Sequence, residues 1–401
     1  LVLGQIHLLG RGLPPNEDIA RKWVERSVDM LKEDAELGSV LAATDLYMIY
    51  NESTLLDDHM EEGMKWLRKA ADVGLPRAIT LLGKTLAEEG NTAKGLPLIE
   101  QAAAQHESDA HFLLWQIYRA GMGTKPDEEK AFQALEQAAK LRNITAMHVL
   151  AEWHRTHPEA EGSREAADDW YRRAHDGFLV LANRGNIDAM SALVVLYGQG
   201  RGVEQDEAEA LRWLQRTAEL GEAKAQFLMA NAYENGLGVE RNPDRALSWY
   251  KRSAAEGYLP SMIALGAIHQ QGALGTRKNM SVAHTWHQKA FEETRKLAEK
   301  DDPDAQNLLS TFYAQGLGTD PNRAESIRWL RASGKNGYLP AIMKLGSIYS
   351  RGENVMRDVE EALQWIHMAA ELGEARAQYL LGKAYYESKT LETDYPESYK
   401  W

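Results

Sequence analysis

Residues 225–233 read Ala-Gln-Phe-Leu-Met-Ala-Asn-Ala-Tyr, and residues 377–385 read Ala-Gln-Tyr-Leu-Leu-Gly-Lys-Ala-Tyr. The nine-residue pattern that they share returns along the chain. It starts at Ser39, Ala78, Ala110, Ala146, Ala189, Ala225, Ser261, Ala305, Ala341 and Ala377. Five of the nine steps between these starts are 36 residues long, and a fixed period of this length is the signature of a protein built from tandem repeats.

Each copy of the pattern predicts a first helix, which we call helix A. Its first, fifth and ninth positions are four residues apart, a spacing that places their side chains on one face of an α-helix. A small residue at the sixth position would let the next helix approach closely. The small residues are Gly83, Ala230, Gly266, Gly346 and Gly382.

A second helix, helix B, is predicted around a tryptophan at a regular distance. Trp170, Trp213, Trp249, Trp329, Trp365 and Trp401 lie 24 residues after the start of their pattern, and Trp66 and Trp286 lie 27 and 25 residues after it. This fixed register indicates packing residues of the core. Seven residues before the tryptophan, or before the residue that replaces it, lies a side chain that can cap a helix N-terminus. These are Asn16, Asn91, Asp127, Ser163, Asp206, Asn242, Asn279, Asn322, Asp358 and Asp394.

Glycines mark the ends of both helices. Gly-x-Gly turns separate helix A from helix B at Gly10/Gly12, Gly121/Gly123, Gly200/Gly202, Gly236/Gly238 and Gly316/Gly318. Gly74, Gly221, Gly257, Gly337 and Gly373 fall eight residues after a tryptophan, where a left-handed residue can end a helix. No stretch alternates with a period of two, so we expect no β-sheet.

The full pattern, Ala-x-x-x-Leu-Gly-x-x-Tyr, then Gly-x-Gly, then Ala-x-x-Trp-x-x-x-Ala-Ala-x-x-Gly, resembles the Sel1-like repeat family, a relative of the tetratricopeptide repeats. The resemblance implies an all-α fold, a right-handed α-solenoid of about ten helix–turn–helix repeats. We expect one continuous domain over residues 1–401, with incomplete first and last repeats. Some members of the family pair cysteines, and this chain has none.

Three repeats are longer than the rest. The next pattern comes four residues late after Trp23, and seven residues late after Trp170 and after Trp286. Such excesses amount to one or two helical turns, so we expect long B helices around residues 164–185 and 280–301. Two interpretations stay open: drift in repeat length, or ridges that form a partner-specific surface.

Charge and composition limit the classes of partner. Lys and Arg number 46 and Asp and Glu 59, a net charge of −13. An acidic chain repels phosphate backbones and anionic lipids, so a basic protein partner is favoured over nucleic acid. No run of 18 apolar residues predicts a membrane-spanning helix. The absence of cysteine excludes disulfides and thiolate nucleophiles. The compartment stays open, and our expectation is a periplasmic protein or membrane-anchored lipoprotein rather than a cytoplasmic one.

No catalytic or metal-binding motif stands out. His284 and His287, like His154 and His157, are three residues apart and could share a metal, but neither pair has a clear third ligand. The glycine-rich stretch at 198–202 lacks the Lys-Ser/Thr of a phosphate loop and is interpreted as a repeat turn. We therefore predict no enzyme, no cofactor and no metal.

Candidate binding residues follow from helix geometry. If helix A lines the concave side, as in related solenoids, its third and seventh positions form one stripe, which mixes aromatic, methionine and amide side chains rather than repeating aliphatic ones. Aromatic residues and methionine are enriched at interfaces. The candidates are Phe112, Gln116, His148, Glu152, Phe227, Asn231, Ile263, Asn307, Met343, Tyr379 and Lys383. The alternative is that the aromatic residues fill space within a repeat.

The resemblance implies a module that holds a protein partner. One use is that of a bacterial immunity protein that neutralises a secreted toxin, such as a phospholipase effector. The alternative is a scaffold in cell-envelope assembly or exopolysaccharide export. The residues alone do not choose between these two.

Overall fold

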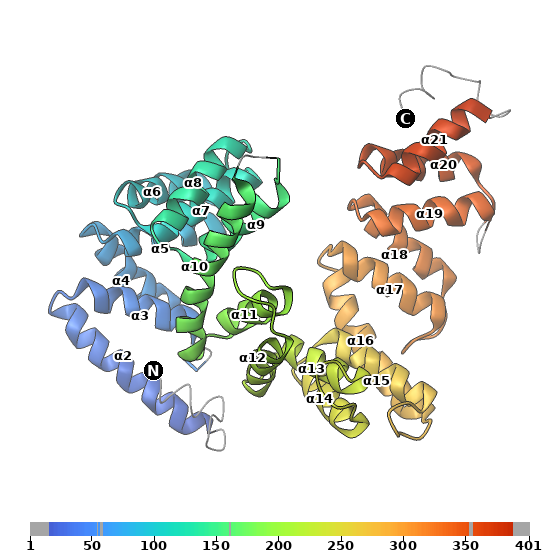
Figure 1. Ribbon diagram of the computed structural model, residues 1–401, viewed down its shortest axis with the longest axis horizontal. Helices are drawn as coiled ribbons and strands as arrows, with labels where there is room; N and C mark the ends of the chain where they lie inside the picture. The colour runs from blue at the N-terminus through green and yellow to red at the C-terminus, as the bar shows by residue number, and fades with distance from the viewer. Residues whose placement is uncertain (1–15, 54, 57–58, 160–161, 353–355, 388–401) are drawn as a thin grey trace. The chain divides into compact units, whose positions relative to one another are not determined.

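The computed structural model describes residues 16–53, 55–56, 59–159, 162–352 and 356–387 (Figure 1). Within these ranges every regular element is an α-helix and none is a strand. The A helices are α3 (Val40–Glu52), α5 (Pro76–Glu88), α7 (Ser108–Ala120), α9 (Ile144–Thr156), α11 (Ile187–Gln199), α13 (Ala223–Asn235), α15 (Leu259–Gln271), α17 (Pro303–Gln315), α19 (Leu339–Arg351) and α21 (Ala375–Glu387). The predicted all-α repeat fold is confirmed.

The B helices alternate with them along the chain. They are α2 (Glu17–Glu36), α4 (Met60–Asp72), α6 (Thr92–Ala104), α8 (Glu128–Lys140), α10 (Ser163–Asn183), α12 (Glu207–Glu219), α14 (Pro243–Ala255), α16 (Met280–Ala298), α18 (Arg323–Lys335) and α20 (Val359–Glu371). Most B helices have 13 residues, whereas α2 has 20, α10 has 21 and α16 has 19. The long helices predicted around 164–185 and 280–301 are therefore confirmed.

The helices pack into two compact units, the first ending at Leu220 and the second beginning at Gly221. The first unit contains α2 to α12, and the second contains α13 to α21. Within each unit, consecutive helices lie side by side (Figure 1). That all repeats form one continuous domain stays a prediction.

The sequence located most helix N-caps correctly. Seven predicted side chains accept a hydrogen bond from the backbone N–H three residues later, at 2.9–3.1 Å: Asn16, Asp127, Asp206, Asn242, Asn279, Asn322 and Asp358. Asn91 occupies the cap position but makes no such bond. The prediction for Ser163 is wrong, because Gly162 holds the cap position and Ser163 is the first helical residue. Asp394 lies outside the described residues.

The glycine stops after helix B have the expected backbone. Gly74, Gly221, Gly257, Gly337 and Gly373 have φ between +82° and +97°, the left-handed region that glycine enters at little cost. The Gly-x-Gly turns from Gly121 onward also have positive φ, while Gly10 and Gly12 lie outside the described residues. Where glycine is missing, His106, Arg142 and Asp301 take the same conformation, with φ of 62–68°.

Close approach of helices A and B depends on the small sixth residue of the pattern. A Cβ at Gly83 would lie 2.6 Å from Cγ1 of Ile99, and one at Gly346 would lie 3.0 Å from Cγ1 of Ile366. Both partners directly follow the tryptophan position of helix B. Such short contacts confirm that these glycines allow the two helices to pack together.

The repeated tryptophans are not all core residues, which corrects part of the prediction. Trp213 and Trp365 are buried, at 6% and 7% exposed, but the others described are half-buried. Six of them lie beneath a cation three residues later, with the charged group 4.2–5.9 Å from the ring centre: Trp23/Arg26, Trp66/Lys69, Trp170/Arg173, Trp213/Arg216, Trp249/Arg252 and Trp286/Lys289. Except at the buried Trp213, the aliphatic stem and charge of the cation cover an indole that the core leaves partly open.

Candidate protein-binding surface

The predicted binding residues all lie on A helices, but they do not form one cluster. Four of its residues belong to the first unit, on α7 and α9, and seven to the second, on α13 to α21. Gln116, Tyr379 and Lys383 are exposed, and the others are half-buried. Tyr379 is the most open aromatic of the stripe, at 67% exposed.

Two candidates on α13 are held by their own repeat. The Phe227 ring lies 5.8 Å from the Tyr250 ring and 5.5 Å from the Tyr258 ring, measured between centres. The hydroxyl of Tyr250 donates to Oδ1 of Asn231 at 2.6 Å. These contacts favour the alternative interpretation for Phe227, in which position 3 fills space within the repeat.

On α9, Glu152 belongs to an ion-pair network. Its carboxylate pairs with Nη2 of Arg155 at 3.0 Å and with Arg201 from the next glycine turn. Burial tends to raise the pKa of Glu152, but the Tyr171 hydroxyl, Arg155 and Arg201 outweigh it and lower the pKa. Burial and the Glu152 carboxylate raise the pKa of Tyr171 to about 12. This network fixes the end of α9 against the neighbouring elements.

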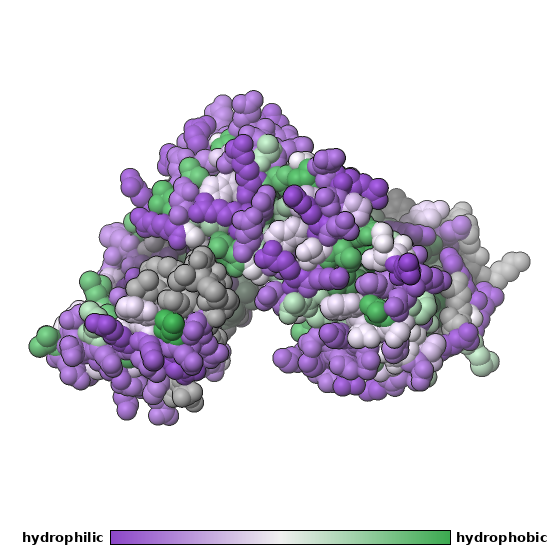
Figure 2. Space-filling model, turned by 90° about the horizontal axis from the view of Figure 1, so that it is seen from below, coloured by the Kyte–Doolittle hydropathy of each residue, from purple (hydrophilic) through white to green (hydrophobic). Residues whose placement is uncertain are grey.

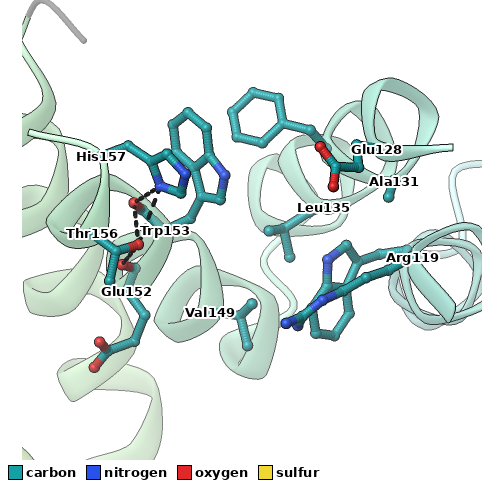
Figure 3. A pocket seen from close by; sticks show the side chains of 11 residues that line it. Arg119, Glu128, Ala131, Leu135, Val149, Glu152, Trp153, Thr156 and His157 are labelled. Atoms are coloured by element: carbon teal, nitrogen blue, oxygen red, sulfur yellow. Dashed lines mark hydrogen bonds between the residues drawn. The ribbon is translucent and has the colours of Figure 1, made fainter. Parts of the chain in front are cut away.

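Beside Glu152, a hollow of about 380 Å³ opens between α7, α8 and α9, and we call it the α7–α9 hollow (Figure 3). Apolar and aromatic side chains make up most of its walls. The lining residues are Trp115, Arg119, Glu128, Ala131, Phe132, Leu135, Val149, Glu152, Trp153, Thr156 and His157. Of the residues predicted to bind a partner, only Glu152 lines it.

The hollow contains two tryptophans that stand outside the repeated register. Nine of the eleven tryptophans follow the helix-B spacing, and the exceptions are Trp115 and Trp153. Trp115 occupies the sixth position of its pattern, where six of the nine other repeats carry glycine or alanine, and Trp153 occupies the eighth. The sequence argument missed both, although a tryptophan out of register was a visible signal.

Both indoles are held in place by neighbouring rings. Trp115 stacks on Phe112, with ring centres 5.0 Å apart, and carries the Arg119 guanidinium 5.4 Å from its centre. Trp153 packs against Phe132 at 4.3 Å and stacks on His157 at 4.4 Å. Both indoles are therefore packed against other side chains in the walls of the hollow.

The acidic residues are distributed unevenly between the units. Residues 1–220 contain 24 Lys and Arg and 36 Asp and Glu, a net charge of −12, whereas residues 221–401 contain 22 and 23, a net charge of −1. The sequence argument used only the total and missed this asymmetry. Nearly all of the net charge thus belongs to the unit that contains the hollow.

Other kinds of site find little support. Among the described residues, no three His, Asp or Glu side chains are grouped so that they could hold a metal. His284 is exposed while His287 is buried, so that pair does not present two ligands together.

Among the described residues, no helix has the length and apolar character to cross a membrane. The face seen in Figure 2 is mostly hydrophilic, with hydrophobic residues in small separate groups.

Comparison with protein families gives one repeated match. A model described as the Sel1 repeat matches residues 2–30, 57–75, 108–143, 187–222, 223–258, 259–293, 303–338, 339–374 and 375–401. Together these segments cover well over half of the chain.

Two curated relatives match over part of their length. An uncharacterised protein of Neisseria meningitidis is 29% identical over 175 residues, which are 43% of this chain and 34% of that protein. The chitin synthase regulator SKT5 of Saccharomyces cerevisiae is 30% identical over 231 residues, 56% of this chain and 27% of that protein. The chain thus spans about a third or less of the curated relatives that it matches.

Solved structures of repeat proteins are also similar. The protective antigen c5321 of uropathogenic Escherichia coli is 28% identical, with a TM-score of 0.43 over 100% of this chain and 82% of that one. A Sel1 repeat protein of Oxalobacter formigenes is 25% identical, with a TM-score of 0.42 over 80% and 89%. An immunity protein of Pseudomonas aeruginosa is 18% identical, with a TM-score of 0.35 over 51% and 75%.

Proposed function

The chain belongs to the Sel1 repeat family, a protein-interaction fold, and from this premise we propose that it holds a basic protein partner. The observation that carries the proposal is the net charge of −12 on residues 1–220. A surface with one sign of charge attracts a partner of the opposite sign and speeds their encounter. Proteins of this fold are typically non-catalytic scaffolds, and we propose the same for this chain.

In its more specific form, the proposal is that of an immunity protein that neutralises a basic toxin, such as a secreted phospholipase effector. An acidic unit can cover a basic toxin surface and exclude the toxin's target. The observation that supports this use is again the net charge, nearly all of which belongs to one unit.

A second candidate is a scaffold for polysaccharide synthesis or export in the cell envelope. Its support is the 30% identity over 231 residues with a chitin synthase regulator. Such a scaffold would hold an enzyme or an assembly factor without inhibiting it.

Capture from the native cell tests the general proposal. The full chain is immobilised, bound proteins are eluted with a salt gradient, and the eluted proteins are identified by mass spectrometry. We expect a basic protein that elutes as salt screens the charges. Retention of acidic proteins alone, or retention that salt does not change, would contradict the proposal.

Co-expression separates the two specific uses. An immunity protein should restore the growth of cells that make its captured partner, and a scaffold should leave growth unchanged. A partner that is harmless when made alone excludes the immunity function.

A further inference from the structure

We infer that the α7–α9 hollow receives one large apolar side chain from a basic segment of the partner. This inference rests on the proposed function and assigns it a site and a binding chemistry. Its basis is the shape of the hollow, the packing of its walls and the charge around it.

The hollow lies where the repeat departs from its usual packing. In the preceding repeat, Gly83 lets Ile99 approach so closely that a Cβ would lie only 2.6 Å away. In α7 the same position carries Trp115, and the residue of α8 that corresponds to Ile99 is Leu135. Trp115 and Leu135 both line the hollow. An indole in the place of a glycine thus coincides with an open space instead of close helix packing.

The second departure lies on α9. The eighth position of the pattern is a buried aliphatic residue in neighbouring repeats, such as Ile117 and Leu196, at 3% and 0% exposed. On α9 this position is Trp153, which is half-buried and lines the hollow. Two neighbouring A helices therefore both carry tryptophan instead of their usual small or aliphatic residue.

The packing of the walls favours an apolar occupant over a stacked cation. Trp115 is already covered by Phe112 and Arg119, and Trp153 by Phe132 and His157. An incoming cation would have to compete with these neighbours for the ring faces. An apolar side chain needs only the edges of the rings and the aliphatic walls. Because the wall side chains already pack against one another, we expect little conformational entropy to be lost when the hollow is filled.

The charge at the edge of the hollow indicates which residues of the partner flank the apolar side chain. Glu152 is already neutralised by Arg155 and Arg201. Glu128 is exposed, and no hydrogen bond or ion pair to it is observed among the described residues. Figure 3 shows Glu128 across the hollow from Trp153. The unit around it also has a net charge of −12. Both this charge and the free Glu128 carboxylate favour a partner that carries lysine or arginine next to its apolar side chain.

The probe is a fluorescein-labelled peptide with one central leucine flanked by lysines, titrated with the full chain at low salt and followed by fluorescence anisotropy. We expect saturable binding that weakens about 30-fold when the leucine becomes glycine, as for an interface hot spot. A peptide with glutamine in place of lysine should also bind more weakly. Equal binding of the leucine and glycine peptides, or no saturable binding of either, would overturn the inference.

Two matched charge reversals locate the site on the protein. Glu128→Lys changes the charge at the hollow, and Glu33→Lys makes the same change on α2, where Glu33 is exposed. Both side chains are outside the core, so both variants should fold. We expect Glu128→Lys to weaken leucine-peptide binding about tenfold and Glu33→Lys to weaken it less than twofold. Equal losses would show a general effect of charge and no defined site.

Trp153→Ala tests the apolar wall, with its melting temperature measured beside its peptide affinity. A folded variant that binds the leucine peptide as weakly as wild type binds the glycine peptide supports the inference. If the native partner binds the chain in a salt-dependent way and neither Trp153→Ala nor Glu128→Lys changes its affinity, the inference about the hollow is wrong and the proposed function stands. If no basic partner is retained, the proposed function itself is wrong.

Discussion

The two units are built from the same helix–turn–helix repeat but differ in charge and in where their tryptophans lie. Residues 221–401, which form the second unit, have a net charge close to zero. Among the described residues of this unit, no A helix contains a tryptophan. In the first unit, residues 1–220 carry a net charge of −12, and α7 and α9 each carry an additional tryptophan at the α7–α9 hollow. The shared repeat therefore explains the fold, and the departures from it are the basis of the binding site that we propose.

The largest expected effect compares a buried tryptophan of the second unit with a cation-covered one of the first. Trp365 is 7% exposed and packs against Gly334, so Trp365→Ala should reduce the free energy of unfolding by about 3–5 kcal/mol through the cavity that it leaves. Trp170 is half-buried beneath Arg173, and Trp170→Ala should cost about 2 kcal/mol because less apolar surface is lost. Urea denaturation followed by circular dichroism measures both.

Equal losses at these two positions would show that the cation covers the indole as completely as the core does. A larger loss at Trp170 would contradict the distinction between buried and half-buried tryptophans. Arg173→Gln is the control, since it removes the charge over Trp170 and keeps the indole.

A smaller effect concerns pH and His287 of the second unit. His287 is 5% exposed, and neither of its ring nitrogens has a hydrogen-bond partner among the described residues. Burial, and to a lesser degree His284, lowers its pKa below the ordinary value of 6.5. As the pH falls below that value, the unfolded chain takes up a proton that the folded chain does not, so the free energy of unfolding decreases. One such group contributes at most about 1.4 kcal/mol for each pH unit.

This prediction is checked by measuring urea midpoints of wild type and His287→Leu between about pH 7.5 and pH 5.5. That range extends about one unit to either side of the ordinary histidine pKa. The variant should lose less stability than wild type over that range. His148 of the first unit also has a pKa lowered by burial, so His148→Leu shows whether the first unit has the same dependence. An identical pH dependence in His287→Leu and wild type would contradict the assignment.

The sequence predicted local features well because they depend on neighbouring residues. Helix N-caps such as Asp206 and stops such as Gly221 require only a side chain or a backbone conformation at one point. Ser163 fails as a cap because Gly162 precedes it and the Ser163 hydroxyl lies 3.2 Å from Nδ1 of His154. Cap spacing alone does not show that competition.

Features that depend on several helices were harder to predict. Periodicity placed the repeated tryptophans in the core, but it did not show that a lysine or arginine three residues later covers most of them. The α7–α9 hollow depends on the volumes of Trp115 and Leu135 on separate helices. The position of Trp115 in the pattern was readable from the sequence, yet the space beside it was not.

The smallest expected effect compares two helix ends that lack glycine. Arg142 in the first unit has φ of 68°, and Asp301 in the second has φ of 62°. A left-handed backbone is strained for most side chains, and Asp tolerates it better than Arg. The Asp301 carboxylate also accepts a hydrogen bond from Nε2 of Gln306 at 3.3 Å. Arg142→Gly should therefore stabilise the protein by about 0.5–1 kcal/mol, whereas Asp301→Gly should give no gain. Melting temperatures of both variants decide the point, with Gly221→Ala as the control that should destabilise. A gain at Asp301 as large as that at Arg142 would mean that backbone strain alone sets the effect and that the hydrogen bond to Gln306 contributes nothing.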